Sequence, residues 1–247
     1  MTRFLGVALA TALLFVGIGP AQADDQDAKS IVDKAIKALG GEEKLGKVNA
    51  FSWKGKGTIT FNGNENDFTS EMTFKGLDQY RREFGNDQFT GIVVLDGTKG
   101  WRKFGENSTV LDGDALANEK RTVYLNVLPI TLVAIKGKGF KYEAGGEEKV
   151  GAKPAVVLKV TGPDGKDFTL SFDKESGLPV KQVAKVIGFQ GQEYTSETTY
   201  ADYKDFGGIK KATKVVVKRD GEPFQSWEVT EFKVLDKVDD AKFAEPK

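Results

Sequence analysis

The chain has 247 residues, 36 basic and 36 acidic side chains, no cysteine and no histidine. The lack of histidine excludes Ser-His-Asp and Cys-His triads and histidine-based zinc sites, and no disulfide can support the fold. The basic residues are scattered among acidic ones, which is not the clustered excess that nucleic acid requires. We therefore expect neither an enzyme nor a nucleic-acid-binding protein, and no cofactor or metal.

Residues 1–23 have the features of a secretory signal peptide. Arg3 supplies a basic start, Phe4–Ile18 is an apolar run, and Ala21-Gln-Ala23 is a small-x-small cleavage site. Cleavage after Ala23 removes one basic residue from 36 and no acidic one, so the net charge becomes minus one. The absence of cysteine also removes a lipobox. We expect residues 24–247 to form a single domain that is soluble, periplasmic, monomeric and not membrane-spanning.

The next element is an amphipathic helix over Asp27–Leu39, which Gly40-Gly41 ends. From Phe51 the apolar period changes to two, and this period predicts β-strands. In successive strands Trp53 and Phe61, then Phe74, then Tyr80, Arg82 and Phe84 fall on one face. One face of the predicted sheet is therefore aromatic, and another element has to cover it.

The most apolar stretch lies mid-chain, from Val123 to Ile135. It follows a polar segment, 112–121, that is rich in helix formers, with Asp112 or Asp114 as the expected N-cap. Pro129 is expected to break the helix, so the sequence predicts two short helices and then a loop at 136–139. Two interpretations remain open for this stretch: a core helix packed on the sheet, or a movable lid over an apolar cavity.

After residue 140 the alternation resumes and continues to Leu235, with connections of hairpin length. Roughly ten strands that follow one another in this way predict an antiparallel meander, which curls into a barrel or part of one. The expected fold is mainly β with few helices (α+β): a single curled antiparallel sheet. The N-terminal helix and the central apolar stretch are the candidates to cover its aromatic face.

Four segments are hairpin signatures of moderate specificity: Gly91–Trp101 (GIVVLDGTKGW), Phe172–Val180 (FDKESGLPV), Tyr200–Ile209 (YADYKDFGGI) and Asp239–Pro246 (DDAKFAEP). In this order they resemble the periplasmic lipoprotein carriers of the LolA/LolB type, over nearly all of the chain after residue 23. The resemblance implies an incomplete β-barrel covered by the N-terminal helix and a central helical lid. It also implies a hydrophobic cavity for the acyl chains of lipoproteins, and membrane-anchored donor and acceptor proteins as partners.

One position departs from the family pattern. The carriers have Lys-Arg-Pro before the first large bend, where the arginine helps to hold the lid closed. This sequence has Lys75-Gly76-Leu77, so the lysine fits and Gly76 replaces the arginine. The difference favours a divergent, more general lipid-binding relative.

We expect acyl chains of a lipoprotein or another lipid to lie in the cavity beneath the lid. The predicted ligand-binding residues are Trp53, Phe61, Phe74, Tyr80, Arg82, Trp101, Tyr124, Leu128 and Leu132. An inward arginine needs a partner, because burial of an unpaired charge is costly. We expect Arg82 to meet a lid carbonyl, an acid or an anionic head group of the ligand, or else to reach water at a strand end.

Two other functions remain open. The same half-barrel can serve as an envelope sensor or adaptor that binds a protein partner. A secreted hydrolase with two carboxylates is disfavoured, because the acid pairs Glu42-Glu43, Glu147-Glu148 and Asp239-Asp240 fall in predicted turns or helix ends.

Overall fold

The structure, a computed structural model, describes residues 25–61 and 63–247, so the signal peptide predicted over 1–23 lies outside the described residues. The strands are β1 (Ala50–Phe61), β2 (Asn64–Lys75), β3 (Gln79–Gly85), β4 (Thr90–Asp96), β5 (Lys99–Phe104), β6 (Asn107–Val110), β7 (Lys141–Val150), β8 (Lys153–Thr161), β9 (Asp167–Asp173), β10 (Pro179–Ile187), β11 (Glu193–Asp205), β12 (Lys210–Arg219) and β13 (Glu222–Val234). The α-helices are α1 (Asp25–Leu39), α2 (Glu42–Leu45) and α3 (Gly113–Thr131), and the 3-10 helices are η1 (Val133–Lys136) and η2 (Asp240–Phe243). Among the described helices, none is both long and apolar enough to cross a membrane.

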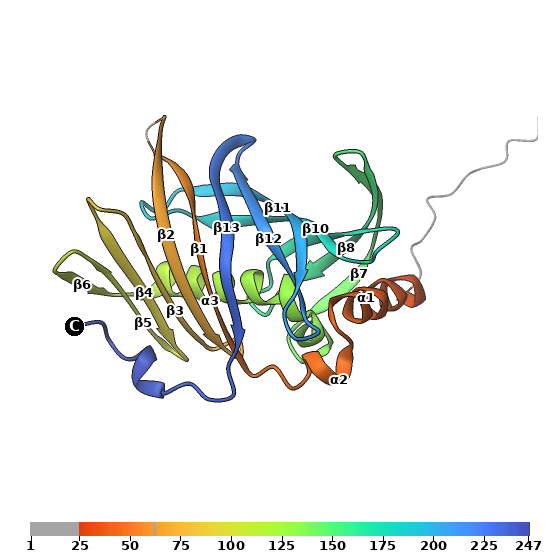
Figure 1. Ribbon diagram of the computed structural model, residues 1–247, viewed down its shortest axis with the longest axis horizontal. Coiled ribbons are helices and arrows are strands. Elements are labelled where there is room, and N and C mark those ends of the chain that lie inside the picture. Colours follow the sequence, from red (N-terminus) through yellow and green to blue (C-terminus); the bar gives the residue numbers. More distant parts are fainter. Residues whose placement is uncertain (1–24, 62) are drawn as a thin grey trace, which may run out of the picture.

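All these strands belong to one antiparallel sheet in the order β6-β5-β4-β3-β2-β1-β13-β12-β11-β10-β9-β8-β7. Sequence neighbours pair, as the hairpin-length turns predict, and β1 also pairs with β13. The sheet curls around α3 but does not close, because β6 and β7 are its two edges (Figure 1). The predicted incomplete barrel is confirmed. The sequence predicted too few strands, partly because β6 has only four residues, all of them exposed.

The opening helix, α1, covers one end of the barrel, as predicted. Its buried side chains, Ala28, Val32, Ala35, Ile36 and Leu39, have the spacing of a single helical face. This face packs against β7, β8, β12 and α3. Lys136 in η1 binds Asp33 in α1 at 2.8 Å and Glu42 in α2 at 2.9 Å, so ion pairs join the opening helices to the end of the central segment.

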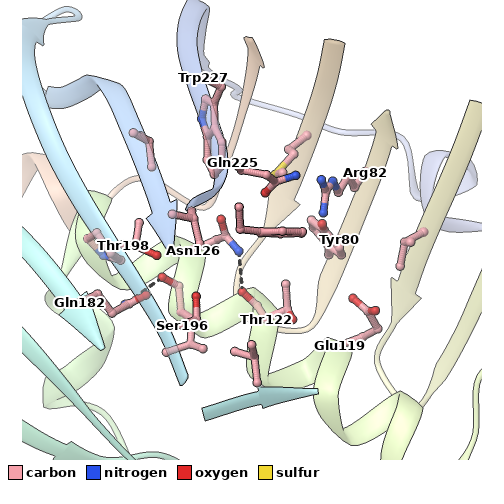
Figure 2. A pocket seen from close by; sticks show the side chains of 18 of the residues that line it. Tyr80, Arg82, Glu119, Thr122, Asn126, Gln182, Ser196, Thr198, Gln225 and Trp227 are labelled. Carbon is pink, nitrogen blue, oxygen red and sulfur yellow. Dashed lines mark hydrogen bonds between the residues drawn. The ribbon is translucent and has the colours of Figure 1, made fainter. Parts of the chain in front are cut away.

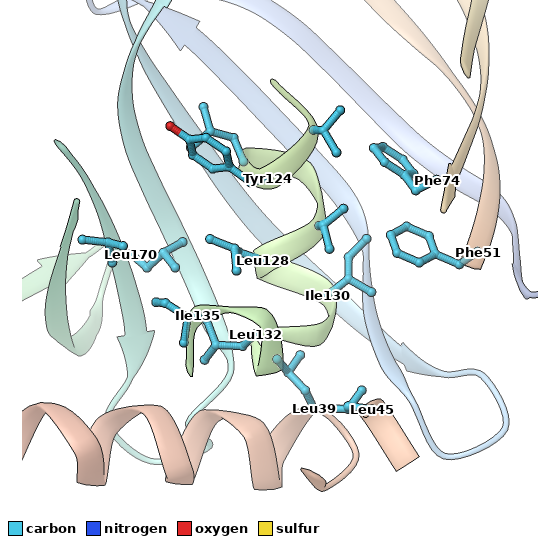
Figure 3. Packing of buried hydrophobic residues seen from close by; sticks show 14 of the residues in the cluster. Leu39, Leu45, Phe51, Phe74, Tyr124, Leu128, Ile130, Leu132, Ile135 and Leu170 are labelled. Atoms are coloured by element: carbon cyan, nitrogen blue, oxygen red, sulfur yellow. The ribbon is translucent and has the colours of Figure 1, made fainter. Parts of the chain in front are cut away.

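The central apolar stretch crosses the hollow of the sheet as α3. Leu128 and Leu132 are completely buried, and they pack with Ile135 and Leu170 on one side of the helix (Figure 3). Ile130 lies on the other side, toward the aromatic rings of Phe51 and Phe74 (Figure 3). The helix therefore joins the two arms of the curled sheet into one core.

The prediction that Pro129 divides the central segment into two helices is wrong, because α3 continues through Pro129 to Thr131. Proline at position 129 cannot donate the helical hydrogen bond to the carbonyl of Leu125. The side chain of Gln182 in β10, which is 6% exposed, replaces that donor, with its Nε2 at 3.1 Å from the Leu125 oxygen. The helix ends instead at Leu132, whose φ of 51° is left-handed.

Side chains of α3 fix the helix to the β9–β10 arm of the sheet. Arg121, 2% exposed, donates to the carbonyls of Lys185 and Asp167, each at 2.8 Å, and pairs with Asp164 at 3.1 Å. Asn118 bonds both backbone groups of Ile187, at 3.1 Å and 2.8 Å. These contacts favour the core-helix interpretation of the segment over the movable lid.

The hydrogen bond from Gln182 to the Leu125 carbonyl, which Pro129 leaves without a helical donor, can be tested by a double-mutant cycle. Gln182→Leu leaves a buried carbonyl without a donor, so we expect the free energy of unfolding to fall by about 1–3 kcal/mol in denaturant titrations. In a Pro129→Ala background the helix supplies its own N–H, so the same substitution should cost much less. Gln225→Leu, another glutamine that lines the hollow, is the control. Equal costs of Gln182→Leu in both backgrounds would contradict this role.

Candidate functional site

A cavity of about 180 Å³ lies between the concave face of the sheet and α3. Its lining comes from strands on both arms, β1 to β5 and β10 to β13, and from the face of α3 that carries Asn118, Thr122 and Asn126 (Figure 2). The cavity thus occupies the part of the hollow that the apolar core leaves unfilled.

Two tryptophans form an apolar part of the lining, and the ammonium group of Lys211 lies 5.8 Å from the centre of the Trp53 ring. The rings of Trp53 in β1 and Trp227 in β13 stack at 5.9 Å with an angle of 9° between their planes. Gly55 makes room for them, because a Cβ at this position would lie 3.3 Å and 3.4 Å from atoms of the two rings. Met72, the strand neighbour of Trp53, and Ile130 of α3 also line the cavity.

Other parts of the lining are polar, which distinguishes this cavity from a plain hydrophobic core. On α3, the Thr122 hydroxyl donates to the Asn118 carbonyl at 2.9 Å, and the Asn126 amide donates to the Thr122 carbonyl at 2.8 Å. Thr198 in β11 and Gln225 in β13 also face the cavity (Figure 2). An occupant of this space would therefore contact both apolar and hydrogen-bonding surfaces.

Four cationic side chains and a single carboxylate, Glu119, are among the described residues that line the cavity. Glu119 accepts a hydrogen bond from Arg102 at 3.2 Å. Burial raises the pKa of Glu119, whereas the charge of Arg102 opposes this shift. Lys211 is 6% exposed, donates to the Ala212 carbonyl at 3.1 Å, and forms no salt bridge with any described acid. Burial lowers its pKa from 10.5 to about 8.

A cluster of phenylalanines lies at the mouth of the cavity. Phe189, in the β10–β11 turn, stacks on Phe84 of β3 at 6.3 Å and meets Phe104 of β5 edge-on at 5.6 Å. Phe89 joins Phe84 at 6.4 Å. Phe89, Phe104 and Phe189 are 41%, 39% and 52% exposed. In the described part of the chain, opposite arms of the sheet therefore meet here through side chains and not through strand pairing: Phe189 contacts Phe84, Phe104 and the Arg102 guanidinium, which lies 4.6 Å from its ring.

The structure brings only some of the predicted site residues together. Trp53, Tyr80 and Arg82 line the cavity. Phe74, Tyr124, Leu128 and Leu132 are buried in the core and do not line it. Trp101 pairs with Val94, whereas their neighbours Arg102 and Val93 line the cavity, so Trp101 faces the outside of the sheet. The backbone of Phe61 lies in β1, but its side chain is outside the described part of the structure.

Most of the polar residues that line the cavity were not predicted from the sequence: Asn118, Thr122, Asn126, Gln182, Ser196, Thr198, Lys211 and Gln225. One signal was present, since Asn118, Thr122 and Asn126 recur every four residues along the central helix. The strands give no such signal. Polar residues alternate with apolar ones along a strand, and this pattern is the same whether the polar face points inward or toward solvent.

No protein-family model and no curated protein matches the sequence. Solved structures do match. A LolA superfamily protein from Nitrosomonas europaea has a TM-score of 0.59 and 13% identity, over 88% of this chain and 97% of that chain. A DUF1329 family protein from Desulfovibrio piger has a TM-score of 0.56 and 14% identity, with the same coverage. A Vibrio parahaemolyticus domain described as a putative outer membrane lipoprotein-sorting protein has a TM-score of 0.53 and 9% identity, over 86% and 97%. The resemblance indicated by the sequence is confirmed at the level of the fold.

The buried charge of Lys211 predicts a pH dependence of stability. Below pH 8 the folded protein must bury an ammonium group, whereas from pH 8 to 10.5 it releases the proton and the unfolded chain retains it. We therefore expect Lys211→Met to be more stable than the natural protein by about 3 kcal/mol at pH 7, and the difference to vanish as pH rises to 10.5. Denaturant titrations across this range measure it. Lys210→Met, an exposed neighbour, is the control, and a difference independent of pH would contradict the assignment.

Proposed function

Because the chain has the fold of the LolA superfamily, we propose that it is a soluble periplasmic carrier that binds acyl chains of a lipoprotein or another lipid. The binding site is the cavity between α3 and the sheet. The observation that carries the proposal is the apolar part of the lining, where Trp53, Trp227, Met72 and Ile130 border one cavity beneath α3. The signal peptide predicted for residues 1–23 supports the periplasmic location.

The energetics of such binding follow from burial. Each methylene transferred from water to an apolar site contributes about 0.8 kcal/mol, so a single acyl chain is enough for tight binding. Sites for drug-sized ligands usually enclose about 300–1,000 Å³, so a long chain requires the cavity to widen beyond its 180 Å³. The phenylalanine cluster at the mouth is the place for this change, since its rings are partly exposed and no backbone hydrogen bonds need to break.

The names of the structural neighbours agree with lipid cargo. One is a LolA superfamily protein and another is described as a putative lipoprotein-sorting protein. In this chain, unlike a purely apolar lipid cavity, the occupied space would also contact the polar face of α3. This difference favours an amphiphilic ligand with one or few chains.

The three tryptophans provide a direct test, because two of them line the cavity and one faces away. We expect a brominated acyl chain, 9,10-dibromostearate, to quench the fluorescence of a Trp101→Phe variant, which keeps Trp53 and Trp227. A Trp53→Phe/Trp227→Phe variant keeps only Trp101 and should not be quenched. Quenching of Trp101 alone would place the chain on the outer face, and no quenching in either variant would contradict lipid binding.

A further inference from the structure

Two of the cations that line the cavity form no salt bridge with an acid in the described part of the chain. Arg82 in β3 and Arg219 in β12 both line the cavity, and neither forms a salt bridge with a described acid. Glu119 pairs with Arg102 instead. Asp220, next to Arg219, lies in the β12–β13 turn, where its carboxylate accepts the Thr195 N–H at 2.8 Å.

Aromatic rings hold these two guanidinium groups in place. The Arg82 guanidinium lies 4.5 Å from the centre of the Phe84 ring, and that of Arg219 lies 3.5 Å from the Phe224 ring. Each has a buried Nε that finds no hydrogen-bond partner among the described residues. Buried donors without acceptors are costly, so they mark a place where an acceptor is expected to bind.

The two arginines line the same cavity from strands that are not neighbours in the sheet. Three strands, β2, β1 and β13, separate β3 from β12 in the sheet, which corresponds to roughly 19 Å along its surface. Burial lowers the pKa of Arg219, and the positive charge of Arg82 acts in the same direction. Two like charges therefore face the same space from opposite sides.

Neutral donors surround the same place. Tyr80, from the strand that carries Arg82, and Gln225, from β13, point toward the Arg82 guanidinium (Figure 2). Burial raises the pKa of Tyr80, so its hydroxyl remains protonated and can donate a hydrogen bond at neutral pH. Planar guanidinium groups and hydroxyl donors are the groups that proteins use to bind carboxylates and phosphates.

We propose that Arg82 and Arg219 bind the anionic head group of the carried amphiphile, a carboxylate or a phosphate, while its chain lies against Trp53 and Trp227. This assignment rests on the proposed lipid-binding function and adds the class of ligand.

The test compares ligands that have the same twelve-carbon chain and different heads: dodecanoate, dodecyl phosphate and uncharged glycerol monododecanoate. We expect isothermal titration calorimetry to show that the anionic ligands bind about ten- to a hundredfold more tightly than the uncharged one. The preference should disappear in Arg82→Gln/Arg219→Gln and persist in Arg82→Lys/Arg219→Lys. Arg81→Gln, on the outer face of β3, is the matched control and should retain the full preference.

The outcomes separate the two proposals. Equal affinity for all three ligands would overturn the anionic head-group site and leave acyl-chain binding intact. A preference that survives Arg82→Gln/Arg219→Gln would overturn the assignment to these arginines. Binding of none of the ligands would overturn the proposed function, and the head-group site with it. Tighter binding of dodecanoate would indicate a fatty acid as the natural ligand, and tighter binding of dodecyl phosphate would indicate a phosphorylated lipid.

Discussion

The segment that contains α3 joins the two edge strands of the sheet, β6 and β7, and its helix crosses the hollow of the curl. With the helix in place, the sheet cannot close and its interior has two parts. The face of α3 with Leu128 packs on the β7–β10 arm, and the face with Thr122 borders the cavity. Arg121 fixes the helix to one arm. The cavity is therefore a consequence of the topology rather than of loose packing.

The polar side chains in the hollow reduce stability compared with a fully apolar interior. Lys211 is the clearest example, because burial lowers its pKa to about 8 and no described acid forms a salt bridge with it. Arg82 and Arg219 add buried donors that lack partners. Proteins keep such groups mainly where they bind something. An amphiphile with an anionic end accounts for both features of the lining, since its chain matches the tryptophan end and its head matches the arginines.

The period-two pattern was sufficient to predict the curled sheet, the aromatic inner face and the inward direction of Arg82. It failed where a distant residue decides the local structure: α3 continues through Pro129 because Gln182, far along the chain, binds the carbonyl that proline leaves free. Trp101 was predicted to line the cavity but faces outward. The strand β5 is short, and the residue before Trp101 that faces inward is Gly100, which has no side chain to mark the inner face in the sequence. Inward polar residues such as Thr198 were missed because alternation alone does not show which face is buried.

The most direct test of lipid binding in the hollow around α3 is a crystal structure of the protein with 12-bromododecanoate, in which anomalous scattering locates the bromine. We predict bromine between α3 and the sheet, near Trp53 and Trp227, and the carboxylate between Arg82 and Arg219. Bromine found only on the outer face of the sheet, or a cavity that stays closed at saturating ligand, would contradict the claim that the hollow around α3 is a lipid-binding site.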